Sequence, residues 1–493
     1  HSPPEAQKRC LSVLSRFSGY HKKDHPLMAL RFYNTLTQRV EEFAPLEGNT
    51  VRMYTCGPTV WNYAHVGNLR TFTFVDLLRR WLRYRGYRLD HVMNITDVDD
   101  RIIQQALAAG KTLTEYTEQY TQAFLEDCAA LRLERPERLT PATEHIPAMV
   151  KLIAGLRAKG CTYDSEGSIY YRIASFPEYG KLSHTDFSGI RAGARVDTDR
   201  YDKADARDFA LWKAPKPGEP FWESEIGPGR PGWHIECSAM AMHYLGETLD
   251  IHAGGIDLVF PHHENEIAQS EGLTGKPFAR FWLHAEHLIL ESQTMSKSLG
   301  NFITLRGVLS QGYPPEAIRY LLASVPYRKR LNFTADNPKA AATAVERLRN
   351  FELRLKTEKF PEGASEWLQV RAEQARQRFE ESMDDDLNTA EALAAVFEFV
   401  REANTAMDAG DFRSANVPPA LDLLERFDRI FDVLRPSEHA GGLSDAAVEA
   451  LIAERAQARA RRDFARADQI RKQLAEQGII LEDTKGGTRW KRH

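Results

Sequence analysis

Short apolar segments alternate with amphipathic segments over much of the chain, and this alternation restricts the fold more than any other feature of the sequence. Residues 51–55 and 91–96 carry Val, Met, Ile and Tyr in short runs that are typical of strands. Residues 72–84 and 102–107 place apolar side chains at helical spacing. Strands that alternate with helices form a parallel sheet with helices on both faces. We therefore predict an α/β fold with a Rossmann-like, doubly wound parallel sheet.

The alternation is interrupted once. Residues 140–235 contain aromatic and Pro/Gly-rich stretches such as residues 213–220, after which the strand-like residues 249–252 follow. A further helix is predicted after Pro261 and a further strand over residues 281–290. The simplest interpretation is one nucleotide-binding domain that is split by an insertion.

The C-terminal third has a different pattern. Residues 338–435 are almost wholly helical in pattern, and Asn388, with Glu391 three residues later, can cap one of these helices. Residues 436–443 have the composition of a linker. We therefore predict an α-helical bundle that is followed by a small C-terminal tail domain.

The tail, residues 444–493, differs in charge from the rest of the protein. The whole chain has a formal net charge of −4, whereas residues 454–493 carry 11 Lys and Arg against 6 Asp and Glu. A solvated helix face explains such charges as well as a nucleic-acid surface does, and Trp490 among basic residues is suited to stacking on bases. Any nucleic-acid surface must therefore be local.

Cysteine usage and hydropathy indicate the compartment. Five cysteines in 493 residues are an odd number and far too few for a disulfide scaffold, which predicts a reducing, cytoplasmic environment. No apolar run approaches 18 residues, so we expect no membrane association. Residues 1–27 are basic with scattered serines; we expect a disordered leader, with an organellar targeting segment as the alternative.

Two short glycine-containing motifs lie on opposite sides of the insertion. His65-Val-Gly67-Asn68 falls between a predicted strand and a helix, where a glycine lets a triphosphate approach the backbone and the unpaired N–H groups of the helix. The lysine of Met295-Ser-Lys297-Ser-Leu-Gly-Asn301 can neutralise the charge of a leaving pyrophosphate. Either motif alone is more often an ordinary loop, but together they resemble the two signatures of class I aminoacyl-tRNA synthetases.

A third group of residues has the composition of a metal site. His262 and Glu266 are four residues apart, so they project from one face of the helix predicted after Pro261. Cys56 follows a strand beside the first motif, and Cys237 lies farther along the chain. Two thiolates, an imidazole and a carboxylate suit Zn²⁺, whereas His262 and Glu266 alone are better explained by a polar, acidic helix start.

Longer motifs are similar to those of the cysteinyl-tRNA synthetase family, over residues 28–493. They are Thr55-Cys-Gly-Pro-Thr-Val60, Asn94-Ile-Thr-Asp-Val-Asp-Asp100, Arg230-Pro-Gly-Trp-His-Ile-Glu-Cys-Ser238, Gly254-Gly-Ile-Asp-Leu-Val-Phe-Pro-His-His-Glu-Asn-Glu266, Met383-Asp-Asp-Asp-Leu-Asn-Thr389 and Gly487-Thr-Arg-Trp490.

The resemblance implies roles for individual residues. Zinc is expected on Cys56, Cys237, His262 and Glu266, one ion per chain, and the thiolate of the substrate joins it. The remaining expected roles are catalysis by His65, Asn68 and Lys297, nucleotide binding by Gly67, Gly255, Asp257 and Lys297, and cysteine binding by Thr96 and Trp233. Zinc is a sound selectivity device, because a pocket of shape alone separates near-isosteres such as cysteine and serine by only about 10–200-fold.

The activity that the resemblance implies is that of a cysteine–tRNA ligase. Its expected partners are L-cysteine, ATP with Mg²⁺, and tRNA(Cys), with no membrane partner, and we expect a monomer. Two alternatives remain: the cysteine ligase of mycothiol synthesis, which lacks a long C-terminal region, and a non-catalytic zinc- and RNA-binding paralogue.

The resemblance also assigns the segments of the chain. They are, in order, the leader over residues 1–27, the first half of the catalytic domain over 28–139, a connective insertion over 140–235, the second half of the catalytic domain over 236–300, a stem-contact region over 301–337, an anticodon-binding bundle over 338–435, the linker over 436–443 and a tRNA-contacting domain over 444–493.

The second motif departs from the family pattern at one position. The family usually has lysine where this chain has Thr294, which removes one expected contact with the triphosphate and leaves Lys297. Asn68 stands where the first motif often has a second histidine, a variant that is common in the family.

This departure generates a prediction. If Lys297 alone carries the phosphate charge, Lys297→Ala lowers the rate of adenylate formation by roughly 10²–10³-fold, the scale of losing one preorganised transition-state donor. Thr294→Lys is the matched variant and should be neutral or mildly activating in pyrophosphate exchange. A severe loss in Thr294→Lys would show that Thr294 is structural.

Overall fold

A five-stranded parallel sheet lies at the centre of the computed structural model, which describes residues 29–185, 208–294, 302–437, 445–476, 479–484 and 487–492. Its strands, in spatial order, are β11 (Ala279–Ala285), β10 (Leu249–Gly255), β3 (Thr50–Thr55), β4 (Arg88–Ile95) and β5 (Arg138–Pro141). All four adjacent pairs are parallel, which confirms the Rossmann-like prediction. The chain order reverses between β3 and β10, and ligands of such sheets bind at the carboxyl ends of the strands at this point.

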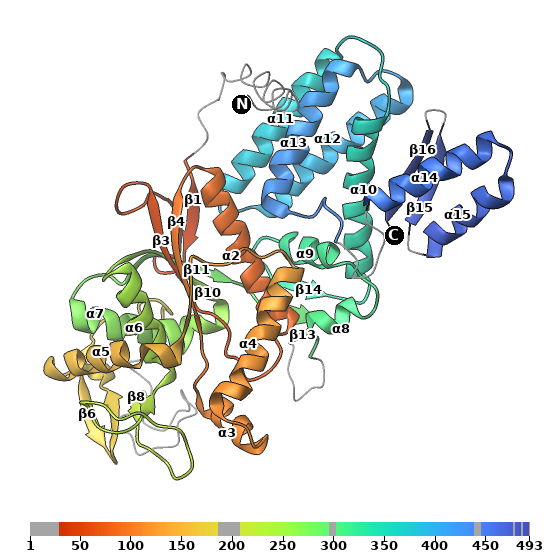
Figure 1. The fold of residues 1–493 in the computed structure, drawn as a ribbon. Helices are drawn as coiled ribbons and strands as arrows, with labels where there is room; N and C mark the ends of the chain where they lie inside the picture. The colour runs from red at the N-terminus through yellow and green to blue at the C-terminus, as the bar shows by residue number, and fades with distance from the viewer. Residues whose placement is uncertain are drawn as a thin grey trace, which may run out of the picture.

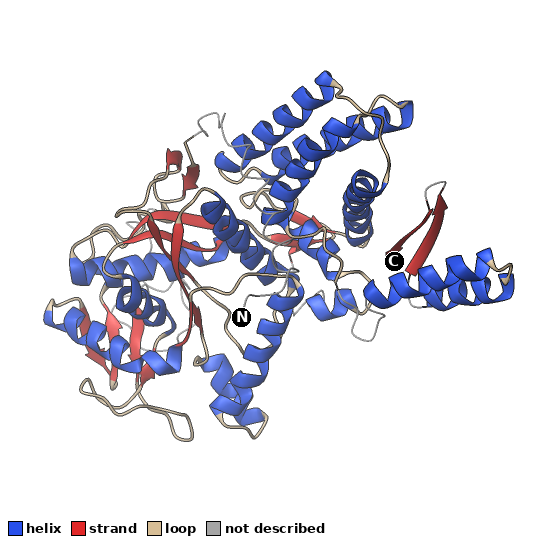
Figure 2. Cartoon of the chain, turned by 45° about the horizontal axis from the view of Figure 1, so that its top comes forward, coloured by secondary structure: helices blue, strands red, loops and turns tan. Residues whose placement is uncertain are grey.

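Helices cover both faces of the sheet, as Figure 2 shows. Successive side chains of a strand point to opposite faces. Val51 and Met53 of β3 therefore belong to the apolar core that includes α2 (Val66–Tyr84), whereas Tyr54 belongs to the core that includes α6 (Trp233–Leu245).

The insertion contains a small antiparallel sheet and one long helix. These elements are α5 (Ile146–Ala158), β6 (Thr162–Ser165), β7 (Ser168–Tyr171), β8 (Phe209–Lys213) and β9 (Arg230–Pro231). The expected limits at residues 140 and 235 fall inside β5 and α6. Both elements belong to the nucleotide-binding domain, because β5 pairs with β4 and α6 packs on the sheet. α7 (Glu264–Thr274) returns the chain to this domain.

The prediction of one strand over residues 281–290 is wrong. β11 ends at Ala285, and β12 (Leu288–Leu290) belongs to a separate sheet with β13 (Gln293–Thr294) and β14 (Leu331–Phe333). The chain leaves the central sheet at Glu286, whose backbone N–H donates to the carbonyl of Tyr327 instead of a neighbouring strand.

Four long helices form the C-terminal bundle. They are α10 (Asn337–Thr357), α11 (Glu366–Asp384), α12 (Thr389–Ala409) and α13 (Val417–Phe431). The predicted cap of α12 is confirmed, since the Asn388 side chain accepts a hydrogen bond from the backbone N–H of Glu391. The buried side chains of the bundle continue into the core beneath α2, so the bundle and the sheet share one apolar interior.

The tail forms a core of its own at one end of the molecule, beside α10 (Figure 1). It consists of α14 (Asp445–Ala460), α15 (Phe464–Glu476), β15 (Ile479–Thr484) and β16 (Gly487–Arg492). Trp490 packs against this core and its Nε1–H donates to Glu449 at 2.5 Å. The indole therefore stabilises the tail. Its ring is only partly buried, so its role as a platform for bases stays a prediction.

The other described elements connect these parts. They are β1 (Arg31–Asn34), β2 (Arg39–Glu42), α3 (Asp100–Ala108), α4 (Leu113–Ala130), α8 (Leu305–Leu309) and α9 (Pro315–Ala323). Among the described residues, no helix has the length and apolar character needed to cross a membrane.

Candidate active site and metal centre

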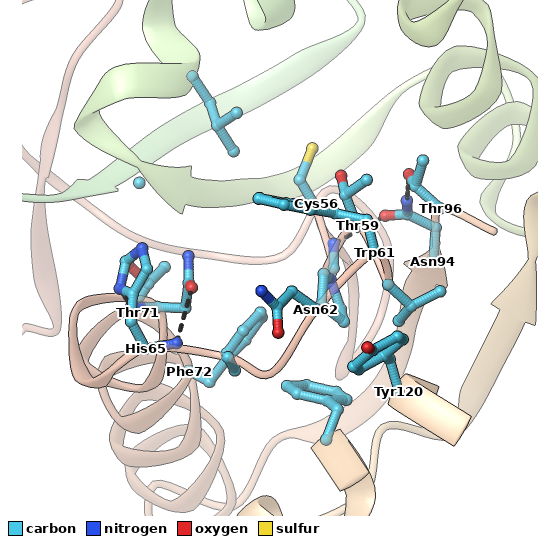
Figure 3. Close-up of a pocket in the computed structure, with 18 of the residues that line it drawn as sticks. Cys56, Thr59, Trp61, Asn62, His65, Thr71, Phe72, Asn94, Thr96 and Tyr120 are labelled. Atoms are coloured by element: carbon cyan, nitrogen blue, oxygen red, sulfur yellow. Dashed lines mark hydrogen bonds between the residues drawn. The ribbon is translucent and has the colours of Figure 1, made fainter. Parts of the chain in front are cut away.

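A pocket of about 660 Å³ opens at the carboxyl ends of β3, β4 and β10, where the chain order of the sheet reverses (Figure 3). It brings together most of the residues that the sequence singles out. Those that line it are Cys56, His65, Asn68, Thr96, Trp233, Cys237, Gly255, Asp257 and His262. The volume is within the usual range for small-molecule sites.

The four predicted metal ligands converge at one end of this pocket. Cys56 directly follows β3, Cys237 lies on α6, His262 lies in the turn before α7, and Glu266 lies on α7. One ligand atom from each lies within 4.8 Å of the others, and all four residues are buried. The two sulfur atoms are 3.7 Å apart, close to the roughly 3.8 Å edge of a tetrahedron whose metal–sulfur bonds are about 2.3 Å.

The charges in this cluster suit a cation. Burial opposes the ionisation of Glu266, but the neighbouring His252 and His262 lower its pKa to about 2. Burial likewise opposes the ionisation of Cys237, but a hydrogen bond from Cys56 and the proximity of His262 lower the pKa of its thiol to about 6. A buried carboxylate and a buried thiolate therefore share one small space, and the donor set fits Zn²⁺.

A layer of imidazoles behind the cluster was missed by the sequence reasoning. His252 Nε2 is 2.8 Å from Glu266 Oε2, which leaves Oε1 to face Cys56 at 3.5 Å. His234 Nδ1 is 3.0 Å from His262 Nδ1, which leaves Nε2 of His262 to face Glu266 Oε1 at 3.1 Å. Partners of this kind orient metal ligands and fix their tautomers.

His263 offers a second arrangement of ligands. Its Nε2 is 3.3 Å from Cys56 Sγ, and its Nδ1 is 2.8 Å from His284 Nε2. Cys56, His252, His263 and Glu266 also place one ligand atom each within 4.8 Å of one another. The only signal in the sequence is that His263 adjoins His262, because His252 and His284 come from two separate strands.

The other end of the pocket is the start of α2. His65 is the N-cap of this helix, and its Nδ1 accepts from the backbone N–H of Asn68 at 3.1 Å while Asn68 Oδ1 accepts from the backbone N–H of His65 at 3.3 Å. Asn68 therefore completes a reciprocal capping box. Because Nδ1 accepts, the neutral imidazole carries its hydrogen on Nε2 and can donate there.

Gly255 and Asp257 lie on the same side of the pocket as the start of α2. A Cβ atom on Gly255 would meet the Asp257 carboxylate and lie 3.7 Å from Thr71 Oγ1. In Figure 3, His65 and Thr71 lie at one side and Thr96 and Tyr120 at the other, with Cys56 between them.

Thr96 and Trp233 line the cluster end. The Trp233 ring stacks on His262 with centroids 4.3 Å apart, and Trp233 is 37% exposed. The ring therefore covers this predicted ligand and faces the pocket. Thr96 is only 2% exposed, and its hydroxyl donates to Glu236 Oε2 at 2.9 Å.

Lys297 and the rest of the second motif, residues 295–301, lie outside the described residues. The chain on the C-terminal side of this motif contacts the first motif. The Phe302 ring meets His65 edge-on at 5.3 Å, and the backbone N–H of Val66 donates to the carbonyl of Ile303 at 3.0 Å.

Comparisons with known proteins agree with this geometry. Residues 42–343 match the family model described as tRNA synthetases class I (C) catalytic domain. Residues 378–434 match the DALR domain, and residues 442–490 match the cysteinyl-tRNA ligase anticodon binding domain. A cysteine–tRNA ligase from Solibacter usitatus is 69% identical over 465 residues, which are 94% of this chain and all of that protein. Another from Koribacter versatilis is 54% identical over 494 residues, with 94% of this chain and all of that protein covered.

This chain belongs to the cysteinyl-tRNA synthetase family. Solved structures outside the cysteinyl-tRNA synthetases share its fold. Methionyl-tRNA synthetase from Mycobacterium tuberculosis, in complex with methionyl-adenylate, has a TM-score of 0.57 at 15% identity and covers 78% of this chain and 91% of its own. A LeuRS–tRNA–LeuAMS complex from Agrobacterium radiobacter has a TM-score of 0.57 at 12% identity and covers 80% and 85%.

The ligand cluster generates a prediction about metal content. Cys237→Ser should weaken Zn²⁺ binding by more than about 100-fold, because a hydroxyl is a poor replacement for a thiolate and even losing a partner of a metal ligand costs 10–100-fold. Metal analysis of the purified protein, with competition by a chelator, measures this. Cys161→Ser is the matched control, since Cys161 is equally buried but outside the cluster. Full zinc content in Cys237→Ser would contradict the assignment.

Proposed function

We propose that this chain activates L-cysteine with ATP and transfers it to the 3′ end of tRNA(Cys). The observation that carries the proposal is that one pocket has two ends of different chemistry. A cluster of possible metal ligands, suited to a thiol, lies at one end, and the capped start of α2 lies at the other. Membership of the family and near full-length relatives named cysteine–tRNA ligase support it.

Cys56, Cys237, His262 and Glu266 would hold one Zn²⁺ per chain. When bound there, zinc would supply a soft Lewis acid with high affinity for the cysteine thiolate and little for the hydroxyl of serine. His252 and His234 hold two of these ligands in orientation.

In the first step, a carboxylate oxygen of cysteine attacks the α-phosphorus of ATP. The new O–P bond forms as the bond between the α-phosphorus and the bridging oxygen breaks, and pyrophosphate leaves with that oxygen. The attacking carboxylate is already ionised, so no general base is required. The chain's own residues therefore act by positioning and by stabilising negative charge.

The nucleotide end of the pocket supplies that stabilisation. His65 donates from Nε2 toward the phosphates, and the N-terminal N–H groups of α2 add their positive dipole beside Gly67. Gly255 and Asp257 bind the ribose of ATP. Lys297 would neutralise the charge that develops on the leaving pyrophosphate, and Mg²⁺ bound with ATP would supply further positive charge there.

The C-terminal region supplies the contacts with tRNA. The DALR match covers the second half of the helical bundle, residues 378–434, and the anticodon-binding match covers most of the tail. The basic excess of residues 454–493 provides phosphate contacts. The presence of this region also argues against the alternative activity of a mycothiol-pathway cysteine ligase, because that ligase lacks a long C-terminal region. We further propose that the enzyme acts as a monomer in a reducing, cytoplasmic environment, in keeping with the free Cys56, Cys128, Cys161 and Cys237.

The test is cysteine-dependent exchange between ATP and labelled pyrophosphate, with the zinc content measured on the same sample. The expected result is robust exchange with cysteine, little with serine, and one zinc per chain. No exchange at full zinc content would identify a non-catalytic paralogue and overturn the proposal.

Removal of the tail separates adenylation from recognition of tRNA. Residues 438–493 are the part to delete, because Ser437 donates to Glu316 at 2.6 Å and should stay. We expect pyrophosphate exchange to remain largely intact and charging of tRNA to fall, chiefly through a higher KM for tRNA. The truncated enzyme should also show a shallower dependence of the tRNA KM on salt, since it makes fewer phosphate contacts. Unchanged kcat/KM for tRNA would show that the tail does not bind tRNA.

A further inference from the structure

A chain of buried hydrogen bonds fixes one wall of the pocket. The backbone N–H of Gly57 donates to Asn94 Oδ1 at 2.8 Å, Asn94 Nδ2 donates to Thr96 Oγ1 at 3.0 Å, and Thr96 Oγ1 donates to Glu236 Oε2 at 2.9 Å. Asn94, Thr96 and Glu236 are each at most 2% exposed. This series of hydrogen bonds thus runs from the turn after β3, across the end of β4, to the first turns of α6.

The directions of these bonds determine what Thr96 offers to a ligand. Asn94 Oδ1 is occupied by the Gly57 N–H, so it is the amide nitrogen that faces Thr96, and an amide nitrogen only donates. The single hydrogen of the Thr96 hydroxyl goes to Glu236. One lone pair of Oγ1 is therefore left for the pocket, and it can only accept a hydrogen bond.

Among the described residues, the Glu236 side chain makes one hydrogen bond, the one to Thr96. Its Oε1 has no hydrogen-bond partner among the described residues, although the residue is fully buried. A buried carboxyl group with one oxygen unsatisfied is costly to the fold, which favours a functional reason for keeping it. It lies behind Thr96 as seen from the pocket, because Thr96 lines the pocket and Glu236 does not.

We propose that Glu236 is a positioning residue that holds the Thr96 hydroxyl as an acceptor for the α-ammonium group of cysteine. This inference rests on the proposed function. Glu236 immediately precedes the metal ligand Cys237 on α6, so a single turn of helix sets both the thiol-binding end and the ammonium-binding wall. Cysteine carries its thiol and its ammonium group on adjacent carbon atoms, which matches two recognition elements that lie side by side.

Three thiol ligands distinguish recognition of the ammonium group from recognition of the carboxylate. L-cysteine carries both groups, cysteamine carries only the ammonium group, and 3-mercaptopropionate carries only the carboxylate. Binding of each to the zinc-loaded full-length enzyme is measured by calorimetry without ATP. The variants are Thr96→Val, which removes the hydroxyl at constant shape, Thr96→Ser, which keeps it, and Glu236→Gln. Thr140→Val is the matched control, because Thr140 pairs with Asn94 in the sheet but does not line the pocket.

The expected pattern depends on the ligand. Thr96→Val should weaken cysteine and cysteamine by about 10- to 100-fold, the scale of a hydrogen bond to a charged group, and leave 3-mercaptopropionate unchanged. Thr96→Ser should restore most of the affinity. Glu236→Gln should weaken the same two ligands by about 3- to 10-fold, and it should add nothing in the Thr96→Val background, because it acts through that hydroxyl.

Equal weakening of all three ligands by Thr96→Val would overturn the inference, and so would weakening confined to 3-mercaptopropionate, since the hydroxyl would then donate to the carboxylate. A Glu236→Gln effect that persists in the Thr96→Val background would also overturn it. Loss of zinc in Glu236→Gln would overturn it as well, because Glu236 would then support the neighbouring Cys237 and not only the Thr96 hydroxyl. Loss of cysteine-dependent exchange in the unmodified enzyme would instead refute the proposed function.

Discussion

The parallel pairing of β3 with β10 is the contact on which the functional geometry depends. Met53 pairs with Ile251 and Thr55 with Ala253, although about two hundred residues of chain separate the two strands. The backbone N–H of Cys56 then donates to the carbonyl of Ala253 at 3.3 Å. This pairing places a strand from the first half of the domain next to a strand from the second half, on opposite sides of the insertion in the sequence. Of the four predicted ligands, Cys56, His262 and Glu266 follow these two strands, and Cys237 lies on α6, the helix that precedes β10.

The cluster of predicted metal ligands lies where the end of β3, α6 and the start of α7 meet. Burying a carboxylate, two thiols and several imidazoles in an apolar interior is unfavourable unless their charges are compensated. The surrounding residues compensate in part: His252 holds one carboxylate oxygen of Glu266, and His262 has its pKa raised to about 10, against the effect of burial, by Cys237 and Glu266. The proposed zinc ion would replace the proton of His262 in this compensation, and it would then link selection of the substrate to stability of this junction of β3, α6 and α7.

The sequence was sufficient for features that depend on local patterns and spacing. The strands near residues 51 and 91, the cap at Asn388 and the common helix face of His262 and Glu266 all follow from short-range rules. The roles of His252, His284 and Glu236 do not, because their contacts arise from strands and helices that meet only in three dimensions. The hydrogen bond of Trp490 could not be predicted for the same reason, because its partner Glu449 lies 41 residues earlier. The break between β11 and β12 was missed because the apolar pattern continues while the hydrogen-bond partners change.

α2 extends from the pocket to the helical bundle. Its N-terminus carries the capping box of His65 and Asn68 in the pocket, and its later turns are fixed to the bundle by buried polar contacts. Asp76 accepts from Arg319 at 2.6 Å, and burial is outweighed there by Arg319 and Arg80, which lower the pKa of the Asp76 carboxyl. One turn later, Trp81 Nε1–H donates to Asp384 at the end of α11. A helix of 19 residues is about 28 Å long and bends little, so a displacement of the bundle on binding tRNA cannot leave the start of α2 unaffected unless these contacts break. Arg319 lies on α9 and also donates to the carbonyl of Ile430 on α13 at 3.3 Å. These contacts therefore couple the bundle, through α9 and α2, to the end of the pocket where we propose that the phosphates bind.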